Sequence, residues 1–128
     1  MGCAAKQDFG VTQNRNWLGQ YGEQRACDFL VRQGYKILDR NARTRSGELD
    51  IVASKDGTLI FVEVKTRTSQ FAGHPLESIT QSKMARIRRL AAAWCMVKQV
   101  PNTQVRFDAI GVLVLGGRVS IEHLKQVG

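Results

Sequence analysis

Apolar and small residues recur with the period of an α-helix between positions 17 and 33. Asn16 is a suitable N-cap and Gly34 a suitable C-terminal stop, so we predict a helix from Trp17 to Gln33. Glu23 falls inside the apolar arc of this helix, although polar positions exist on its other side. This acid either points toward a functional site or pairs with an arginine at the rim of the core.

Runs of apolar and β-branched residues bounded by turn-forming residues predict strands later in the chain. A second helical pattern follows Thr80, a candidate N-cap, and extends from Gln81 to Lys98. The predicted strands cover residues 35–40, 47–52, 59–65, 105–115 and 119–121. The elements follow in the order helix, three strands, helix and one or two further strands. With two strands at the end, the order αβββαββ is that of an α/β protein whose helices flank a mixed β-sheet.

The second helix has a stripe that is typical of core packing and that includes Met84 and Trp94. Lys83 lies in the same arc, whereas Arg86 and Arg89 point elsewhere. Lys83 therefore either reaches a site or a phosphate group, or extends past the core so that its charge stays in water.

Two neighbouring strands carry acids at positions where a buried strand is normally apolar. Asp56-Gly57 between them is a strong signal for a two-residue hairpin turn, in which Lys55 faces Thr58. Counting outward sets Asp50 opposite Glu63, and likewise Glu48 opposite Lys65, with all four side chains on one face. A three-residue turn with a bulge would shift these pairs.

Like charges facing each other on a sheet need a cation, a shared proton or water to stabilise them. Mg²⁺ binds through one or two carboxylates while keeping waters and accepting phosphate oxygens, and Lys65 lies two residues after Glu63 on the same face. An ammonium group there suits phosphodiester hydrolysis. The alternative is a solvated face of an exposed hairpin, but residues 59–64 are otherwise apolar on both faces, which favours a central, covered strand.

The bulk composition favours one basic domain. The chain has 128 residues, 43% of them hydrophobic, a formal charge of +8 and a pI near 9.9, which favours a polyanionic partner such as nucleic acid. Three cysteines without C-x-x-C spacing fit a reducing cytoplasm, and no apolar stretch approaches the roughly 20 residues of a membrane span. We predict a flexible leader over residues 1–15 and a single domain over residues 16–128 in a cytoplasmic protein.

Other enzyme classes lack their residues. The sequence contains neither G-x-S-x-G nor a P-loop, and its two histidines, His74 and His123, do not form a zinc motif. Paired carboxylates also serve glycosidases, but a lysine beside them and a basic surface suit a phosphate substrate better.

The motifs together resemble a known family. Gly22-Glu23, Arg40-Asn41, the segment GELDIV at 47–52, the segment FVEVKTR at 61–67 and VRFD at 105–108 are similar to those of the bacterial YraN-like family of uncharacterised proteins. The resemblance covers residues 16–124 and implies a restriction-endonuclease-like core, close to archaeal Holliday-junction resolvases. Leu49 departs from the superfamily signature, which has proline there.

Carried over by position, the resemblance implies roles for five residues. Asp50, Glu63 and the backbone carbonyl of Val64 would be metal ligands, Lys65 the catalytic lysine and Glu23 the helix acid that completes the site. It also implies a homodimer, because the four-way junction cut by resolvases has two strands to cleave.

These observations predict a Mg²⁺- or Mn²⁺-dependent nuclease that acts on branched or otherwise structured DNA. Four basic residues are predicted to contact phosphates: Arg43, Arg45, Arg67 and Lys83. The alternative is a non-catalytic nucleic-acid-binding or adaptor protein that keeps the nuclease scaffold.

Overall fold

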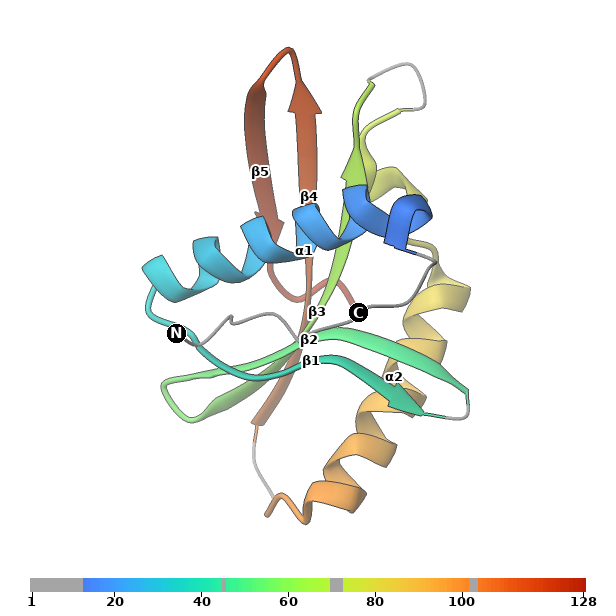
Figure 1. Cartoon of the computed structure of the whole chain (residues 1–128). Helices are drawn as coiled ribbons and strands as arrows, with labels where there is room; N and C mark the ends of the chain where they lie inside the picture. Colours follow the sequence, from blue (N-terminus) through green and yellow to red (C-terminus); the bar gives the residue numbers. More distant parts are fainter. Residues whose placement is uncertain (1–12, 45, 70–72, 102–103) are drawn as a thin grey trace.

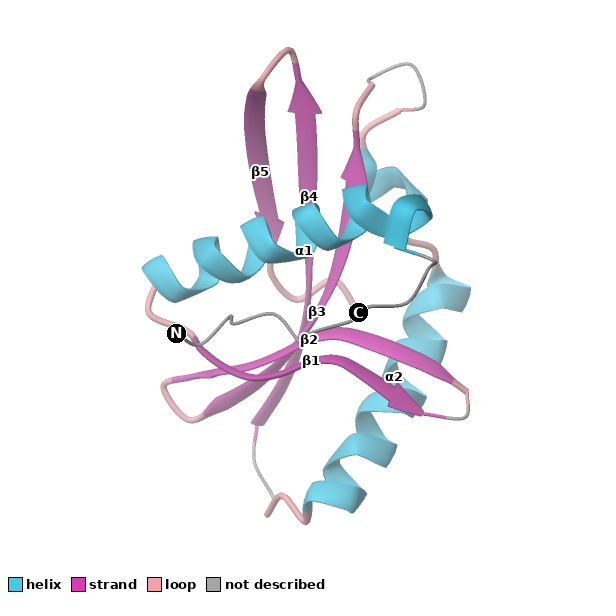
Figure 2. Ribbon diagram, in the orientation of Figure 1, coloured by secondary structure: helices cyan, strands magenta, loops and turns pink. Residues whose placement is uncertain are grey.

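The computed structural model describes residues 13–44, 46–69, 73–101 and 104–128. They form two α-helices, a short 3₁₀ helix and five strands (Figures 1 and 2). In chain order these are α1 (Gln13–Arg32), β1 (Lys36–Thr44), β2 (Gly47–Lys55), β3 (Thr58–Arg67), η2 (Pro75–Ser78), α2 (Gln81–Lys98), β4 (Gln104–Leu115) and β5 (Arg118–Leu124).

The five strands form one sheet in the order β1-β2-β3-β4-β5. Neighbouring strands are antiparallel except β3 and β4, which run parallel and are connected through α2. The sheet is therefore mixed, and the predicted α/β class and the order αβββαββ are confirmed. The acidic strand β3 is central, as its apolar residues on both faces predicted.

Each helix covers one face of the sheet with its own core. Ala26, Cys27 and Leu30 of α1 pack on strand residues that include Ile60, Val62 and Ile110. The predicted stripe of α2 packs on the opposite face, against strand residues that include Val52, Leu59 and Phe61. Because β3 alternates between the two cores, Glu63 shares the face of Leu59 and Phe61 beneath α2.

Helix α2 has the predicted bounds, and Thr80 caps it by accepting a hydrogen bond from the backbone N–H of Lys83 at 3.2 Å. Helix α1 begins earlier than predicted, at Gln13, so Asn16 lies within the helix and is not its N-cap. Residues 13–15, which were assigned to the leader, lie in this helix, and residues 1–12 lie outside the described part. Strand β1 continues to Thr44, four residues beyond the predicted end at residue 40, so Arg43 lies in the strand.

The hairpin between β2 and β3 has the predicted two-residue turn. Asp56 and Gly57 have φ angles of 51° and 80°, and Lys55 pairs with Thr58. The pairing of β2 with β3 extends from Lys55–Thr58 to Ile51–Val62. Asp50 and Glu63 are the next residues in this register.

Beyond this point β2 leaves β3 and stays paired only with β1, as Figure 1 shows. Glu48 accordingly pairs with Arg43 across the β1–β2 ladder. The predicted placement of Glu48 opposite Lys65 is therefore wrong. The prediction extended the pairing of β2 with β3 to Glu48, but the two strands have separated before that residue.

Strand β2 changes its face at Asp50. Leu49 packs in the core beneath α2 and Ile51 in the core beneath α1, although residues two apart in a regular strand share a face. Asn41 lies level with Asp50, between the pairs Arg40–Ile51 and Ala42–Leu49, and has a φ angle of +49°. We infer a local kink across β1 and β2, at the level where β2 separates from β3.

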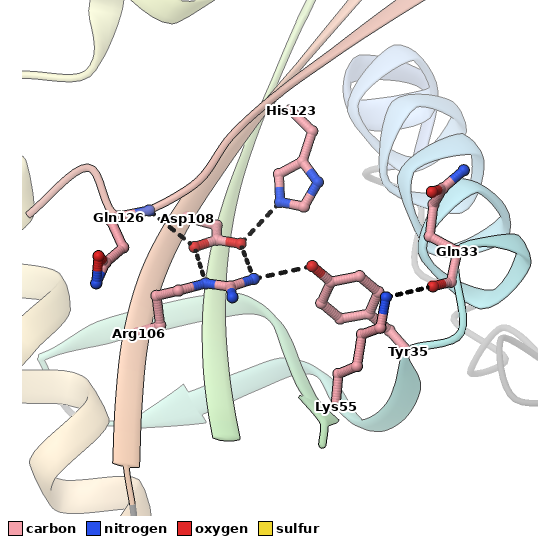
Figure 3. A network of polar contacts seen from close by, with 7 residues as sticks. All are labelled: Gln33, Tyr35, Lys55, Arg106, Asp108, His123 and Gln126. Carbon is pink, nitrogen blue, oxygen red and sulfur yellow. Dashed lines mark hydrogen bonds and ion pairs between the residues drawn. The ribbon is translucent and has the colours of Figure 1, made fainter. Parts of the chain in front are cut away.

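The buried carboxylate of Asp108 organises a second polar group, on the face beneath α1 (Figure 3). It accepts hydrogen bonds from Arg106 Nε and Nη2 at 2.8 Å each, from His123 Nε2 at 2.7 Å and from the backbone N–H of Gln126 at 3.1 Å. Arg106 also donates to the hydroxyl of Tyr35 at 2.8 Å. This network ties the start of β1 to β4, β5 and the C-terminal segment.

Burial alone would raise the pKa of Asp108, but the hydrogen bonds from His123 and Arg106 outweigh burial and lower this pKa to about 2. The Asp108 carboxylate is therefore charged in the folded protein throughout the neutral and mildly acidic range. Because its four acceptor contacts are filled by protein groups, the network reads as structural and not as a ligand site.

Gly22 sets how closely α1 approaches the sheet, because a Cβ at this position would overlap the side chain of Thr66. We expect Gly22→Ala to destabilise the fold by about 1–3 kcal/mol, since overpacking outweighs the better helix propensity of alanine. Gly19 is the matched control, because a Cβ there meets nothing within 4 Å. Urea denaturation should show Gly19→Ala unchanged or stabilised by up to about 1 kcal/mol. Equal effects of the two substitutions would contradict the close packing.

No helix among the described residues is both long and apolar enough to cross a membrane.

Candidate active site

Asp50 and Glu63 form a pair of carboxyl groups where β2 and β3 separate. Their side chains are hydrogen-bonded to each other, which requires a shared proton in the absence of a cation. Asp50 Oδ2 also accepts a hydrogen bond from the backbone N–H of Val64 at 2.8 Å. The predicted meeting of these two acids is confirmed, and Asp50 is held by the strand that carries Glu63.

The pKa values of both acids are raised. Burial raises the pKa of Asp50 to about 8, the charge of Glu63 adds to this rise, and the hydrogen bond from Val64 opposes it. Burial also raises the pKa of Glu63, against the hydrogen bond with Asp50 and the positive charge of Lys65. A bound divalent cation would replace the shared proton and remove the repulsion between two carboxylates.

Glu23 reaches the same region from α1. Its Oε1 accepts a hydrogen bond from Asn41 Nδ2 at 2.7 Å. Burial raises the pKa of Glu23 to about 7, and the charge of Asp50 adds to this rise. We call Glu23, Asp50 and Glu63 the acidic cluster. Glu48 lies nearby, because its charge raises the pKa of both Glu23 and Asp50.

Three cations act on the pKa of Glu63: Lys65 of β3, and Arg86 and Lys83 of α2. Lys83 also lies close to Lys65, whose charge lowers the pKa of Lys83. Two ammonium groups placed together favour an anion between them. From the arc of α2, the sequence left open whether Lys83 reaches a site or extends past the core, whereas Arg86 was predicted to point elsewhere. Sequence reasoning did not place Arg86 at the site. Its long side chain lies against Gly47 at the start of β2.

The other predicted phosphate-binding residues are less closely placed. Arg43 forms an ion pair with Glu48 at 3.6 Å, with its own side chain 81% exposed, so the pair adds little stability. Arg67 ends β3, and its Nε is buried without a hydrogen-bond partner among the described residues. Arg45 lies outside the described residues.

The donor atoms fit a hard divalent cation better than a soft metal. In the described part of the chain, no three or more His, Cys, Asp or Glu side chains are grouped so that they could hold a metal ion. Two carboxylates that share a proton are nevertheless the minimum set through which Mg²⁺ is held when waters and substrate oxygens complete its shell. An ion held by these two acids would therefore depend on waters and on substrate oxygens for the rest of its shell.

The raised pKa values make the stability of the metal-free protein depend on pH. Asp50 and Glu23 keep their protons to about pH 8 and 7 in the folded state, but lose them near pH 4 when unfolded. The folded state therefore binds more protons, and its stability falls as pH rises. With a chelator present, we expect a loss of about 3–7 kcal/mol between pH 5 and pH 8, measured by urea denaturation. A free energy of unfolding that rises over this range would contradict the burial of these acids.

Comparison with known proteins places these residues inside a shared segment. Residues 22–112 match the profile of the uncharacterised protein family UPF0102. A UPF0102 protein of Beutenbergia cavernae is 46% identical over 112 residues, which cover 87% of this chain and 95% of that protein. A UPF0102 protein of Leifsonia xyli is 50% identical over 111 residues, covering 86% and 94% of the two chains. The matched segment contains the whole acidic cluster, Lys65 and Lys83.

Among solved structures, the crystal structure of a repair endonuclease from Pyrococcus abyssi is similar to this chain, with a TM-score of 0.37 and 18% sequence identity. The similarity covers 88% of this chain and 40% of the endonuclease. A likeness at this level decides neither fold nor function.

Proposed function

The chain belongs to the uncharacterised protein family UPF0102, the YraN-like family that its motifs indicated, and we propose that it is a metal-dependent nuclease. One observation carries the proposal. The side chains of Asp50 and Glu63 lie within hydrogen-bonding distance of each other in a central part of the sheet, and the positive charges of Lys65, Arg86 and Lys83 act on Glu63. Paired acids next to clustered cations suit the binding of a divalent metal together with a phosphate group.

In this proposal Asp50 and Glu63 hold Mg²⁺ or Mn²⁺, with the carbonyl oxygen of Val64 as a further ligand suggested by the resemblance. When bound, the metal supplies positive charge to a phosphate oxygen and lowers the pKa of a water molecule. Asp50 is kept in position by the backbone N–H of Val64, so its carboxylate meets the ion with little reorganisation. Glu23 lies at the edge of the pair and accepts a proton from water or orients it.

The cations serve the phosphate. Lys65 lies two residues after Glu63 on the same face and stabilises negative charge that develops on the reacting phosphate. Lys83 and Arg86 approach the same point from α2 and bind its non-reacting oxygens. Arg43 and Arg67 are proposed to contact neighbouring phosphates, and the net charge of +8 favours a nucleic acid over a small phosphate ester.

We propose branched or otherwise structured DNA as the substrate, on the resemblance of the motifs to those of Holliday-junction resolvases. A homodimer would place two such sites on one junction. The second candidate function is non-catalytic nucleic-acid binding on the same scaffold. In the described residues Asp50 and Glu63 have no arginine bonded to them, which favours the catalytic proposal.

The test has two steps. Mn²⁺ and Mg²⁺ are first titrated into the protein by calorimetry, and a four-way junction, a flap and a linear duplex are then offered as substrates. We expect metal binding by the wild type and by Lys65→Ala, and cleavage by the wild type alone, with a loss of at least 100-fold in Lys65→Ala. Lys36→Ala removes the same charge five residues before Asn41 in β1 and should cut normally.

If the wild type binds DNA but neither metal ion, and cuts none of the three substrates, the nuclease proposal is wrong. Non-catalytic nucleic-acid binding then becomes the better proposal. Cleavage that survives Lys65→Ala would leave a nuclease but remove the role of this lysine.

A further inference from the structure

Asn41 has a backbone conformation that is unusual for its place. Four non-glycine residues in the described part of the chain have positive φ angles: Asn41, Asp56, Gln99 and Gln126. Asp56 lies in a hairpin turn, Gln99 caps the end of α2 and Gln126 lies in the C-terminal segment, so their conformation serves a change of direction. Asn41 alone of the four lies inside a strand.

Such a conformation costs about 1 kcal/mol in a residue with a side chain, and glycine would adopt it without this cost. Among residues with a side chain, asparagine is one of those that tolerate it best, and it also carries an amide. The presence of the side chain therefore calls for an interaction that glycine lacks.

The side chain of Asn41 makes that interaction with the acidic cluster. Its Nδ2 donates a hydrogen bond to Glu23 Oε1 at 2.7 Å, across eighteen residues of sequence. This hydrogen bond lowers the pKa of Glu23, against the rise that burial causes. Asn41 also lies level with Asp50 in the β1–β2 register, at the kink where β2 separates from β3. The amide is thus placed between the strand acid and the helix acid.

The hydrogen bond between Asn41 and Glu23 is not the only contact that joins β1 to α1. Arg40 Nη1 donates to Gln24 Oε1 at 3.0 Å, and therefore joins the same two elements one residue away. The bond from Asn41 differs in that its acceptor is a member of the acidic cluster.

We propose that Asn41 is a positioning residue, whose amide holds the carboxyl group of Glu23 toward Asp50 so that the acidic cluster is arranged before a divalent ion enters. The inference rests on the metal-binding function proposed above. Fixing an acid that borders a metal site in this way is a known means of tuning metal affinity.

The substitution Asn41→Gly distinguishes the role of the side-chain amide from that of the backbone conformation. Glycine adopts the same positive φ but lacks the amide that donates to Glu23. We expect its free energy of unfolding, measured in the presence of a chelator, to stay within about 1 kcal/mol of the wild type. Its affinity for Mn²⁺, measured by calorimetry, should fall about 10-fold. Two controls should bind Mn²⁺ like the wild type: Gln24→Ala, which removes the neighbouring contact, and Asp56→Gly, which changes another residue of positive φ.

The contact itself has a readout that needs no metal. The side-chain amide signals of Asn41 in ¹⁵N NMR spectra should shift in Glu23→Ala, and should keep their position in Gln24→Ala.

Wild-type binding of Mn²⁺ together with unchanged affinity in Asn41→Gly would overturn the positioning role and leave the proposed function standing. Amide signals of Asn41 that ignore the loss of Glu23 would overturn it as well. A wild type that binds no Mn²⁺ would remove the proposed function, and the positioning role with it.

Discussion

Replacing Asp50 with asparagine is expected to abolish Mn²⁺ binding and, at the same time, to stabilise the metal-free protein. Burial and the charge of Glu63 raise the pKa of Asp50 to about 8, so an ionised carboxyl is unfavourable at this position. An asparagine still accepts the hydrogen bond from the backbone N–H of Val64, and carries no charge. We expect a gain of about 1–3 kcal/mol in the free energy of unfolding at pH 8, since functional acids are commonly kept at a cost in stability.

Calorimetry with Mn²⁺ and urea denaturation with a chelator measure the two effects on the same protein. We expect the affinity for Mn²⁺ to fall by at least 100-fold, because one of two proposed ligands loses its charge. Asp56→Asn is the matched control, because it makes the same chemical change in the exposed turn of the same hairpin. It should alter neither quantity. If Asp50→Asn bound Mn²⁺ as well as the wild type, the metal site would have to lie elsewhere.

Replacing Asp108 with alanine is expected to have the largest effect on stability. The carboxylate is 1% exposed and accepts hydrogen bonds from Arg106, His123 and the backbone of Gln126. Its removal leaves the guanidinium group of Arg106 largely covered and bonded only to Tyr35. Breaking a buried ion pair on one side costs about 3–5 kcal/mol, a large share of the 5–15 kcal/mol of a typical domain.

Urea denaturation at pH 7 measures this loss. The double variant Asp108→Ala with Arg106→Met should recover part of it, because no uncompensated charge then stays buried. If the single and double variants lost equal stability, the charge of Arg106 would not be the cause. Since the folded pKa of Asp108 is about 2, its contribution is present above about pH 4 and is lost only as pH falls toward 2. The metal-free protein should therefore be most stable near pH 4–5, between the range of Asp108 and that of the acidic cluster.

Local signals made the hairpin and the second helix predictable. Asp56-Gly57 determined both the turn and the register that brings Asp50 to Glu63, because few residue pairs tolerate two positive φ angles. Thr80 marked the first residue of α2 through its side-chain hydrogen bond. The start of α1 was missed, since the two asparagines near its start, Asn14 and Asn16, both lie within the helix and neither is its N-cap.

The divergence of β2 from β3 was not predictable by counting residues. A period of 2 assumes a regular strand, and β2 changes its face at Asp50. Glu48 therefore joins Arg43 instead of Lys65. Asn41 marks the kink in the structure, but asparagine is common in loops. Its presence in the sequence therefore did not indicate a kinked strand.

The Asp108 network and the position of Arg86 depend on contacts between distant segments. Tyr35 and Arg106 are 71 residues apart, and the sequence showed only that Arg106 and Asp108 interrupt an apolar run. The helical period correctly predicted which residues of α2 face the core. It did not predict the position of Arg86, because a long arginine side chain can extend from one face of a helix toward another. Geometry of this kind becomes visible only after the elements are packed.

The single parallel junction of the sheet has a consequence for how the chain folds. The strands β1, β2 and β3 are connected by short turns, as are β4 and β5, so each group forms from contacts that are close in sequence. The acidic cluster belongs entirely to α1 and the first group, whereas β3 gains its other neighbour only when β4 arrives after α2. During synthesis the residues of the cluster leave the ribosome before β4, so we expect their carboxyl groups to stay solvated and ionised until the second half of the protein packs on β3. A divalent ion bound at that stage would lower the cost of burying these charges.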